Sequence, residues 1–312
     1  MKPLKIIFAG TPDYAATVLQ ALLRDTDFLV QAVITQPDMP AGRGLEVRES
    51  AVKKLAKQVG LTIWQPQKVS QIIDQIRELE PDFLVVAAFA QLVPESILKI
   101  PALGPINVHG SLLPRYRGAG VIQAPILNGD SQTGITIMLM DKGLDTGPIL
   151  AQQAIAIAPD ETGESLYDKL ADAGARLLSP TLKALAQGQI KPQAQDNTKA
   201  NYVGLVKKED GLIDWTKPAS DIERLVRAMY SWPGAWTWLK GKQIKITAVD
   251  PIVLPLNVHQ PGKTFIYNNQ LAIQCGTDAL VIQRLKMEGK GEISGKEFIN
   301  GHRQQIGQIL GQ

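Results

Sequence analysis

The first part of the chain alternates short apolar runs with stretches of helical spacing. Residues 83–88 are an unbroken apolar run, and residues 4–9 are apolar apart from Lys5, so both segments predict buried strands. Residues 14–24 place apolar side chains three and four positions apart, which predicts a helix. Further helices are predicted at residues 51–59, 69–79 and 162–186, and further strands at 28–35, 62–64, 106–109, 135–140 and 149–157. Repeated strand–helix–strand units predict an α/β domain with a Rossmann-like, doubly wound, mostly parallel sheet.

A different pattern begins after residue 188. Residues 188–200 are rich in Gly, Gln, Lys, Pro, Asp and Asn without periodicity, which indicates a linker. One helix at 221–229 is followed by short apolar runs that Gly, Pro and Asn interrupt, at 243–249, 263–267, 271–274 and 280–286. Short strands of this kind favour a smaller β-barrel or sandwich. We therefore predict a first domain over 1–188, a linker over 189–206 and a second domain over 207–312.

Composition narrows the class of protein. The 312 residues are 45% hydrophobic and 20% charged, which excludes a disordered chain and suggests about two domains. The apolar runs are too short to cross a bilayer, so no membrane partner is expected. A single cysteine excludes a disulfide framework and fits a cytoplasmic setting. Three histidines leave little scope for a metal site, and no metal is expected.

The charge is unevenly distributed. The chain carries a net charge of +3, and residues 207–312 hold 14 Lys and Arg against 10 Asp and Glu. A basic C-terminal part is compatible with a nucleic-acid partner. Ordinary charge scatter is the alternative explanation.

The strongest candidate chemistry lies in residues 105–118. Asn107 and His109 are two positions apart on a predicted strand, so their side chains share one face. The strand ends in a Gly-Ser turn, and ligands of doubly wound sheets bind at the carboxyl ends of strands. An amide beside an imidazole can stabilise a developing oxyanion. The alternative is a structural pair at a strand end.

A Gly-rich loop between two later strands, residues 140–149, offers Asp141 and Asp145. A carboxylate near His109 would favour the cationic imidazole and could accept a proton from an attacking amine. Turn chemistry is the alternative, because tight turns prefer Asp and Gly. Asp141 is expected to be structural, as an Asx turn, and the sequence alone does not place Asp145 beside His109.

Two other segments have two interpretations each. Residues 36–50 form an unusually long loop with glycines on either side of Arg43. Such a loop is either functional, closing on a substrate or binding phosphate, or a surface insertion. Residues 230–238 contain three tryptophans near lysines, which could stack on bases but more often form a domain core.

Taken together, these motifs resemble the formyltransferases that use 10-formyltetrahydrofolate. The shared stretches are residues 8–12, 107–118 and 141–147. The branch of this family that acts on methionyl-tRNA is similar over more of the chain, including residues 36–44, 213–215, 232–235, 289–290 and 298–301. The resemblance thus covers essentially the whole chain.

The resemblance implies a Rossmann-like catalytic domain and a C-terminal barrel similar to the OB fold, which binds tRNA. The implied reaction moves a formyl group from 10-formyltetrahydrofolate to the α-amine of initiator methionyl-tRNA, in the cytoplasm. A monomeric enzyme without a metal is expected.

The resemblance also implies site residues by match of position. The implied catalytic residues are Asn107, His109 and Asp145. Those implied to line the folate site are Ser111, Leu112, Leu113, Pro114 and, at the pteridine pocket, Phe89. The implied tRNA contacts are Arg43, at the acceptor end, and Lys207 and Lys208.

Two rival functions stay open at this point. One keeps the chemistry and changes the acceptor, as in a sugar-nucleotide or glycinamide-ribotide formyltransferase or a formyltetrahydrofolate hydrolase. The other is an RNA-binding protein without catalysis, in which the α/β domain is a scaffold.

Overall fold

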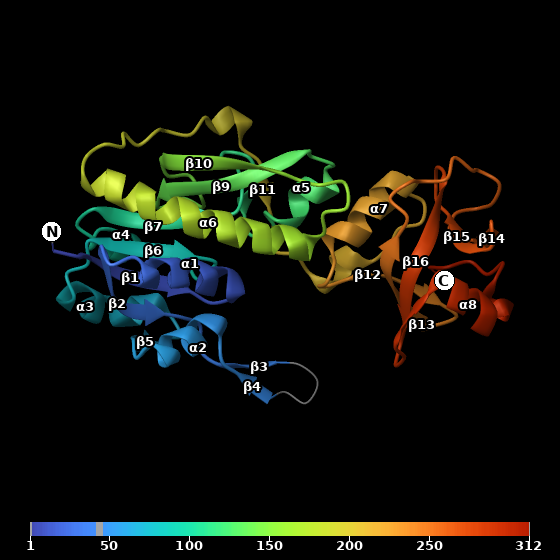
Figure 1. Cartoon of the computed structure of the whole chain (residues 1–312), viewed down its shortest axis with the longest axis horizontal. Coiled ribbons are helices and arrows are strands. Elements are labelled where there is room, and N and C mark those ends of the chain that lie inside the picture. The colour runs from blue at the N-terminus through green and yellow to red at the C-terminus, as the bar shows by residue number, and fades with distance from the viewer. Residues whose placement is uncertain (1, 42–45, 312) are drawn as a thin grey trace. The chain divides into compact units, whose positions relative to one another are not determined.

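The computed structural model describes residues 2–41 and 46–311 (Figure 1). The chain forms two compact units. The first comprises Met1–Val121, Thr133–Ala156 and Tyr167–Val203, and the second comprises Ile122–Gln132, Ile157–Leu166 and Gly204–Gln312. The predicted domain boundaries at 188 and 206 stay a prediction. Within the described ranges, none of the helices combines the length and the apolar character needed to span a bilayer.

A seven-stranded sheet forms the centre of the first unit, with the order β10-β9-β7-β6-β1-β2-β5. The parallel strands are β1 (Leu4–Gly10), β2 (Phe28–Ile34), β5 (Thr62–Trp64), β6 (Phe83–Ala87) and β7 (Gly104–His109). β9 (Gln132–Leu139) is antiparallel to β7, and β10 (Ile149–Ala156) is the edge strand beside it. The predicted mostly parallel sheet is confirmed. The strand order reverses between β1 and β6, and β7 lies next to this point.

Helices pack on the sheet through their apolar faces. α1 (Asp13–Arg24) buries Tyr14, Val18, Leu19 and other residues spaced three and four apart. α6 (Gly163–Ala186) approaches β7 closely, because a Cβ added to Gly174 would lie 2.8 Å from Val108. The shorter helices of this unit are α2 (Ala51–Gln58), η1 (Val69–Ile72), α3 (Ile73–Glu78), α4 (Glu95–Leu98) and η2 (Asn197–Lys199).

Two parts of the first unit differ from the prediction. Residues 36–50 are not wholly a loop, because β3 (Met39–Ala41) and β4 (Glu46–Arg48) pair as an antiparallel ribbon. The predicted linker also contains a strand, β11 (Tyr202–Val203), which pairs in parallel with β8 (Arg117–Gly118). Strands of two or three residues are too short to produce a recognisable period in the sequence.

The second unit carries a six-stranded antiparallel sheet in the order β12-β13-β16-β15-β14, with β17 paired to β16. Its strands are β12 (Ala235–Leu239), β13 (Lys242–Val249), β14 (Thr264–Tyr267), β15 (Gln270–Gln274), β16 (Ala279–Met287) and β17 (Glu292–Ser294). Its helices are α5 (Gln123–Leu127), η3 (Lys208–Gly211), α7 (Ala219–Ala228), α8 (Gly295–Gly301) and η4 (Arg303–Gln305). The separate β domain is confirmed. Among the strands that the structure describes, edge strands β12 and β14 do not pair to close a barrel.

Candidate active site

Asn107 and His109 lie at the carboxyl end of β7, beside the point where the strand order reverses. Their alternation along the strand puts both side chains on one face, as the sequence predicted. His109 is only 6% exposed. The pair is thus held on a rigid central strand, where ligands of doubly wound sheets bind.

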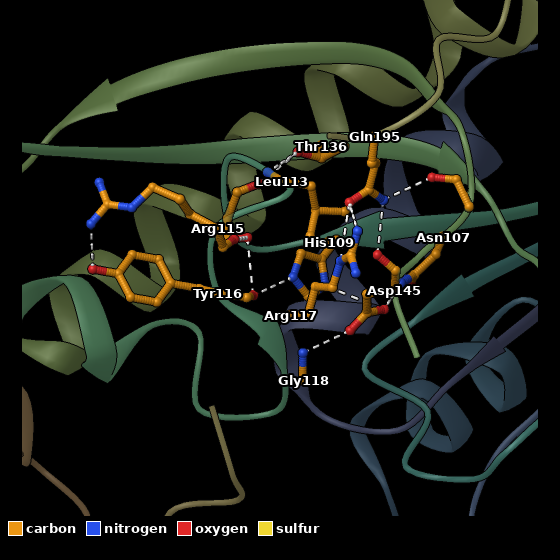
Figure 2. A network of polar contacts seen from close by, with 12 residues as sticks. Asn107, His109, Leu113, Arg115, Tyr116, Arg117, Gly118, Thr136, Asp145 and Gln195 are labelled. Atoms are coloured by element: carbon orange, nitrogen blue, oxygen red, sulfur yellow. Dashed lines mark hydrogen bonds and ion pairs between the residues drawn. The ribbon is translucent and has the colours of Figure 1, made fainter. Parts of the chain in front are cut away.

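Asp145 reaches both of these side chains from the loop between β9 and β10 (Figure 2). Its Oδ1 accepts a hydrogen bond from Asn107 Nδ2 at 3.2 Å and lies 3.7 Å from His109 Nδ1. Its Oδ2 accepts from the backbone N–H of Gly118 at 2.8 Å. The structure therefore brings together the amide, the imidazole and the carboxylate, which the sequence alone could not do.

The imidazole of His109 has a defined orientation. Its Nε2 lies 2.9 Å from the carbonyl oxygen of Tyr116, which can only accept a hydrogen bond, so Nε2 carries a hydrogen. The nitrogen left to interact with a substrate is Nδ1, on the side of Asp145. Asp145 Oδ1 lies 3.7 Å from this nitrogen, so an acceptor oxygen stands beside the Nδ1 edge of the ring.

The turn after β7 is closed by hydrogen bonds of its own. The Ser111 hydroxyl lies 2.7 Å from the carbonyl oxygen of Arg115 and 3.2 Å from that of Tyr116. Leu113 is buried, and its N–H donates to Thr136 of β9 at 3.1 Å. Leu112 and Pro114 are half-buried. This turn is consequently fixed before any ligand binds.

Phe89, expected at the folate site, is buried just beyond β6. Its carbonyl oxygen accepts from Gln36 Nε2 at 3.1 Å. The residues on either side, Ala88 and Ala90, have φ values of +43° and +62°. Left-handed backbone at non-glycine residues is uncommon and concentrates at functional sites.

The other predicted residues lie elsewhere. Asp141 accepts from the Gly143 N–H at 2.9 Å and from the Thr146 hydroxyl at 2.6 Å, so its structural role as an Asx turn is confirmed. Lys207 and Lys208 are exposed residues of the second unit, by η3. Arg43 lies outside the described residues.

The tryptophans of residues 230–238 divide between core and surface. Trp236 is buried and its indole N–H donates to the Lys208 carbonyl oxygen at 3.0 Å. Trp232 is 60% exposed, and Trp238, which is 38% exposed, packs edge-on against Trp236. The core interpretation holds for Trp236 alone.

Three supporting groups were not identified from the sequence. They are the Tyr116 carbonyl, the Gly118 N–H and the Gln195 side chain, whose Nε2 donates to the carbonyl oxygens of Asp145 and Gly147. The first two are backbone groups, which every residue type carries, so the identity of the side chains does not indicate them. Gln195 lies in a segment without periodicity, so no pattern indicated it.

The chain is similar to known protein families and to curated proteins over most of its length. Residues 2–182 match the formyl transferase family model, and residues 205–303 match the model of the formyl transferase C-terminal domain. A methionyl-tRNA formyltransferase of Trichlorobacter lovleyi is 44% identical over 98% of this chain and 96% of its own length. That of Caldanaerobacter subterraneus subsp. tengcongensis is 42% identical over 98% of this chain and all of its own length.

Solved structures show the same fold at low identity. An N-formyltransferase of Helicobacter canadensis, in complex with folinic acid and dTDP-3-aminofucose, superposes with a TM-score of 0.67 and 19% identity, covering 89% of this chain and 98% of its own. HypX of Aquifex aeolicus, in complex with tetrahydrofolic acid, gives 0.61 and 14%, covering 98% of this chain and 48% of its own.

Proposed function

The chain belongs to the formyl transferase family, and we propose that it transfers the formyl group of 10-formyltetrahydrofolate to the α-amine of initiator methionyl-tRNA. Full-length relatives named methionyl-tRNA formyltransferase support the choice of acceptor. One structural observation supports the chemistry most. Asn107, His109 and Asp145 meet at the carboxyl edge of the sheet, with two donors and one acceptor side by side.

The donors are placed to stabilise a tetrahedral oxyanion. The neutral amine of methionine attacks the formyl carbon, and the formyl oxygen becomes negative. Asn107 Nδ2 carries two hydrogens, of which one is donated to Asp145, so the second is available for this oxygen. His109 is placed to stabilise the same charge through its Nδ1 edge. One such donor contributes about 3–4 kcal/mol to the transition state.

Asp145 is placed to accept the proton that the amine loses. Its carboxylate is only 11% exposed, so few water molecules compete for it. Collapse of the intermediate breaks the bond between carbon and N10 of the folate, and N10 takes up a proton. The products are formylmethionyl-tRNA and tetrahydrofolate. The chain's residues act by positioning and electrostatics.

The folate is a substrate, and the described residues suit it. The closed turn of Ser111, Leu112, Leu113 and Pro114 offers a preformed, partly apolar wall beside His109. At the end of β6, the left-handed backbone on either side of Phe89 turns peptide groups out of the strand direction, where a polar heterocycle can bond to them. We assign these five residues to the folate site.

The tRNA is assigned to the C-terminal part. Residues 207–312 carry an excess of basic residues, and Lys207 and Lys208 are exposed there. We propose Lys207, Lys208 and Arg43 as tRNA contacts. The assignment fits a catalytic domain over 1–188, a linker over 189–206 and a tRNA-binding domain over 207–312, in a cytoplasmic monomer.

A comparison of acceptors tests the proposal. The purified chain is incubated with 10-formyltetrahydrofolate and one acceptor at a time: charged initiator tRNA, charged elongator methionyl-tRNA, a dTDP-amino sugar, or water alone. We expect rapid formylation of initiator methionyl-tRNA only. Formylation of the sugar would show that the acceptor is an amino sugar and not tRNA. Hydrolysis of the donor at a similar rate in every sample would show that the acceptor is water. Binding of tRNA without turnover would show that the protein binds RNA without catalysis.

A further inference from the structure

One glutamine of the predicted linker contacts the loop that carries Asp145. The Nε2 of Gln195 donates to the carbonyl oxygens of Asp145 and Gly147, both at 2.8 Å (Figure 2). A carboxamide nitrogen has two hydrogens, so both are committed to this loop. The Gln195 side chain therefore bridges two peptide groups on either side of Thr146.

Arg117 orients the same carboxamide from the other side. The Oε1 of Gln195 accepts from Arg117 Nε at 3.2 Å and from Nη2 at 2.8 Å. Two N–H groups of the guanidinium donate to the same amide oxygen, Gln195 Oε1. These bonds fix the plane of the amide and turn its nitrogen, Nε2, toward Asp145. Without Arg117, rotation of the amide by 180° would present an oxygen to two carbonyl oxygens.

Arg117 is unusual because it is buried and, in the part of the chain that the structure describes, its side chain bonds to neutral groups. It is 2% exposed, and its remaining donors reach Asn197 Oδ1 at 2.7 Å and the Tyr202 hydroxyl at 3.0 Å. The guanidinium also lies 5.6 Å from the centre of the Tyr202 ring. Burying a cation among neutral partners costs free energy. We therefore expect the buried guanidinium to make another favourable contribution.

This contribution is to the backbone conformation of Asp145, which has a φ of +55°. A residue with a side chain adopts this left-handed conformation rarely, and surrounding contacts must hold it there. The two hydrogen bonds from Gln195 are such contacts, because they fix the carbonyl of Asp145 itself and that of Gly147. The conformation in turn aims the carboxylate at Asn107 and His109.

We propose that Gln195, oriented by Arg117, is a positioning residue that holds the Asp145 carboxylate against Asn107 and His109. Its effect on turnover rests on the proposed function, whereas its effect on geometry does not. The segment between the two matched family regions is then part of the catalytic geometry and not only a connection.

The test compares substitutions at Gln195 with one at Gln193. Gln195→Glu keeps the shape and can still accept from Arg117, but it presents an oxygen to the two carbonyl oxygens. Gln195→Ala removes both contacts without adding charge. Gln193→Ala is the matched control, because Gln193 is exposed and pairs with Ile149 through its backbone, which alanine retains.

We expect Gln195→Glu to lower kcat about 10- to 100-fold, because small displacements of catalytic groups have effects of this size. The KM values for folate and for tRNA should stay within about threefold, and Gln193→Ala should stay within about twofold of the parent. A parallel rise of both KM values with unchanged kcat would overturn the proposal.

A second readout does not depend on catalysis. The chain has three histidines, so the ring nitrogen signals of His109, His259 and His302 can be separated by NMR of histidine-labelled protein. We expect the His109 signals to move in both Gln195 variants, with the other two as internal references, and none to move in Gln193→Ala. If the parent does not formylate tRNA, this shift still supports the positioning role.

Two further results would overturn the positioning role. The first is folded Gln195 variants with parental kcat and His109 signals at parental positions. The second is loss of folding in both variants, as judged by circular dichroism, which would assign Gln195 a structural role only.

Discussion

At the scale of single residues, the chemistry of the site depends on which polar atoms already hydrogen-bond within the protein. The Tyr116 carbonyl takes the Nε2 hydrogen of His109, and Asp145 takes one hydrogen of Asn107. What remains is one hydrogen on the amide and the Nδ1 edge of the ring. These leftover donors define where the formyl oxygen binds in the proposed reaction.

Removing the amide should therefore affect the rate more than the fold. We expect Asn107→Ala to lower kcat by about 10²- to 10³-fold, the effect of losing one oxyanion donor. The melting temperature should fall by only a few degrees, because a hydrogen bond to a carboxylate contributes about 1.5–3 kcal/mol. Steady-state kinetics with thermal melting measures both, and a rate within about threefold of the parent would remove Asn107 from the proposed mechanism.

At the scale of elements, the two-residue strands β8 and β11 join distant parts of the first unit. Gly118 has a φ of +107°, and a Cβ added to it would lie 2.3 Å from the carbonyl oxygen of Val203. Its N–H also donates to Asp145. The close approach of the two strands thus requires glycine here and places the hydrogen bond to Asp145 at the same position.

We expect Gly118→Ala to destabilise the protein by about 1–3 kcal/mol, from the strained φ and the steric clash. The value of kcat should fall as well, because Asp145 loses a donor. Gly204→Ala is the control, since no atom lies within 4 Å of its added Cβ and its φ is not left-handed. Urea unfolding and kinetics of the two variants test this, and equal behaviour would contradict it.

A pH-dependent contact lies at the base of the β3–β4 ribbon. Hydrogen bonds from Lys53 and from Gln65 Nε2 hold the pKa of Asp38 below its ordinary value. A carboxylate with a lowered pKa stabilises the fold above its unfolded-state value and loses this contribution as the pH falls through the folded-state value. Asp38→Asn should therefore cost stability at pH 7, and the difference should vanish well below about pH 4.

Urea unfolding of the parent and of Asp38→Asn across that range measures the difference in free energy. Asp74→Asn is a suitable control, because Asp74 also contacts a basic residue but its side chain is 78% exposed on α3. A difference that grows toward low pH would reverse the predicted sign.

At the scale of the whole molecule, charge separates the two parts of the chain. Residues 207–312 have an excess of four positive charges, whereas the whole chain has three. Each contact with a phosphate releases counterions, so the logarithm of the tRNA binding constant should fall linearly with the logarithm of the salt concentration.

Replacing Lys207 or Lys208 by Gln should reduce the slope of that plot by about one each, if each lysine contacts a phosphate. Lys99→Gln provides the control, because Lys99 is an exposed residue of the first unit and is paired with Glu95. Fluorescence titration of tRNA at several salt concentrations gives the slopes, and an unchanged slope would remove that lysine from the interface.

Much of this protein follows from the sequence by itself. The strand at Phe83–Ala87 and the helices α1 and α6 are each longer than one repeat of their hydrophobic pattern. The pattern is therefore visible in the sequence and predicts them. Asn107 and His109 share a face because strand geometry alone requires it.

Only the tertiary structure decided the rest. Asp145 is 38 residues from Asn107, and Gln195 is 50 residues from Asp145, so no local pattern joins them. The ribbon of β8 with β11 and the burial of Arg117 likewise depend on contacts between distant segments. Periodicity records which face of an element is buried, whereas hydrogen bonds between loops are set only when the elements that carry them have packed.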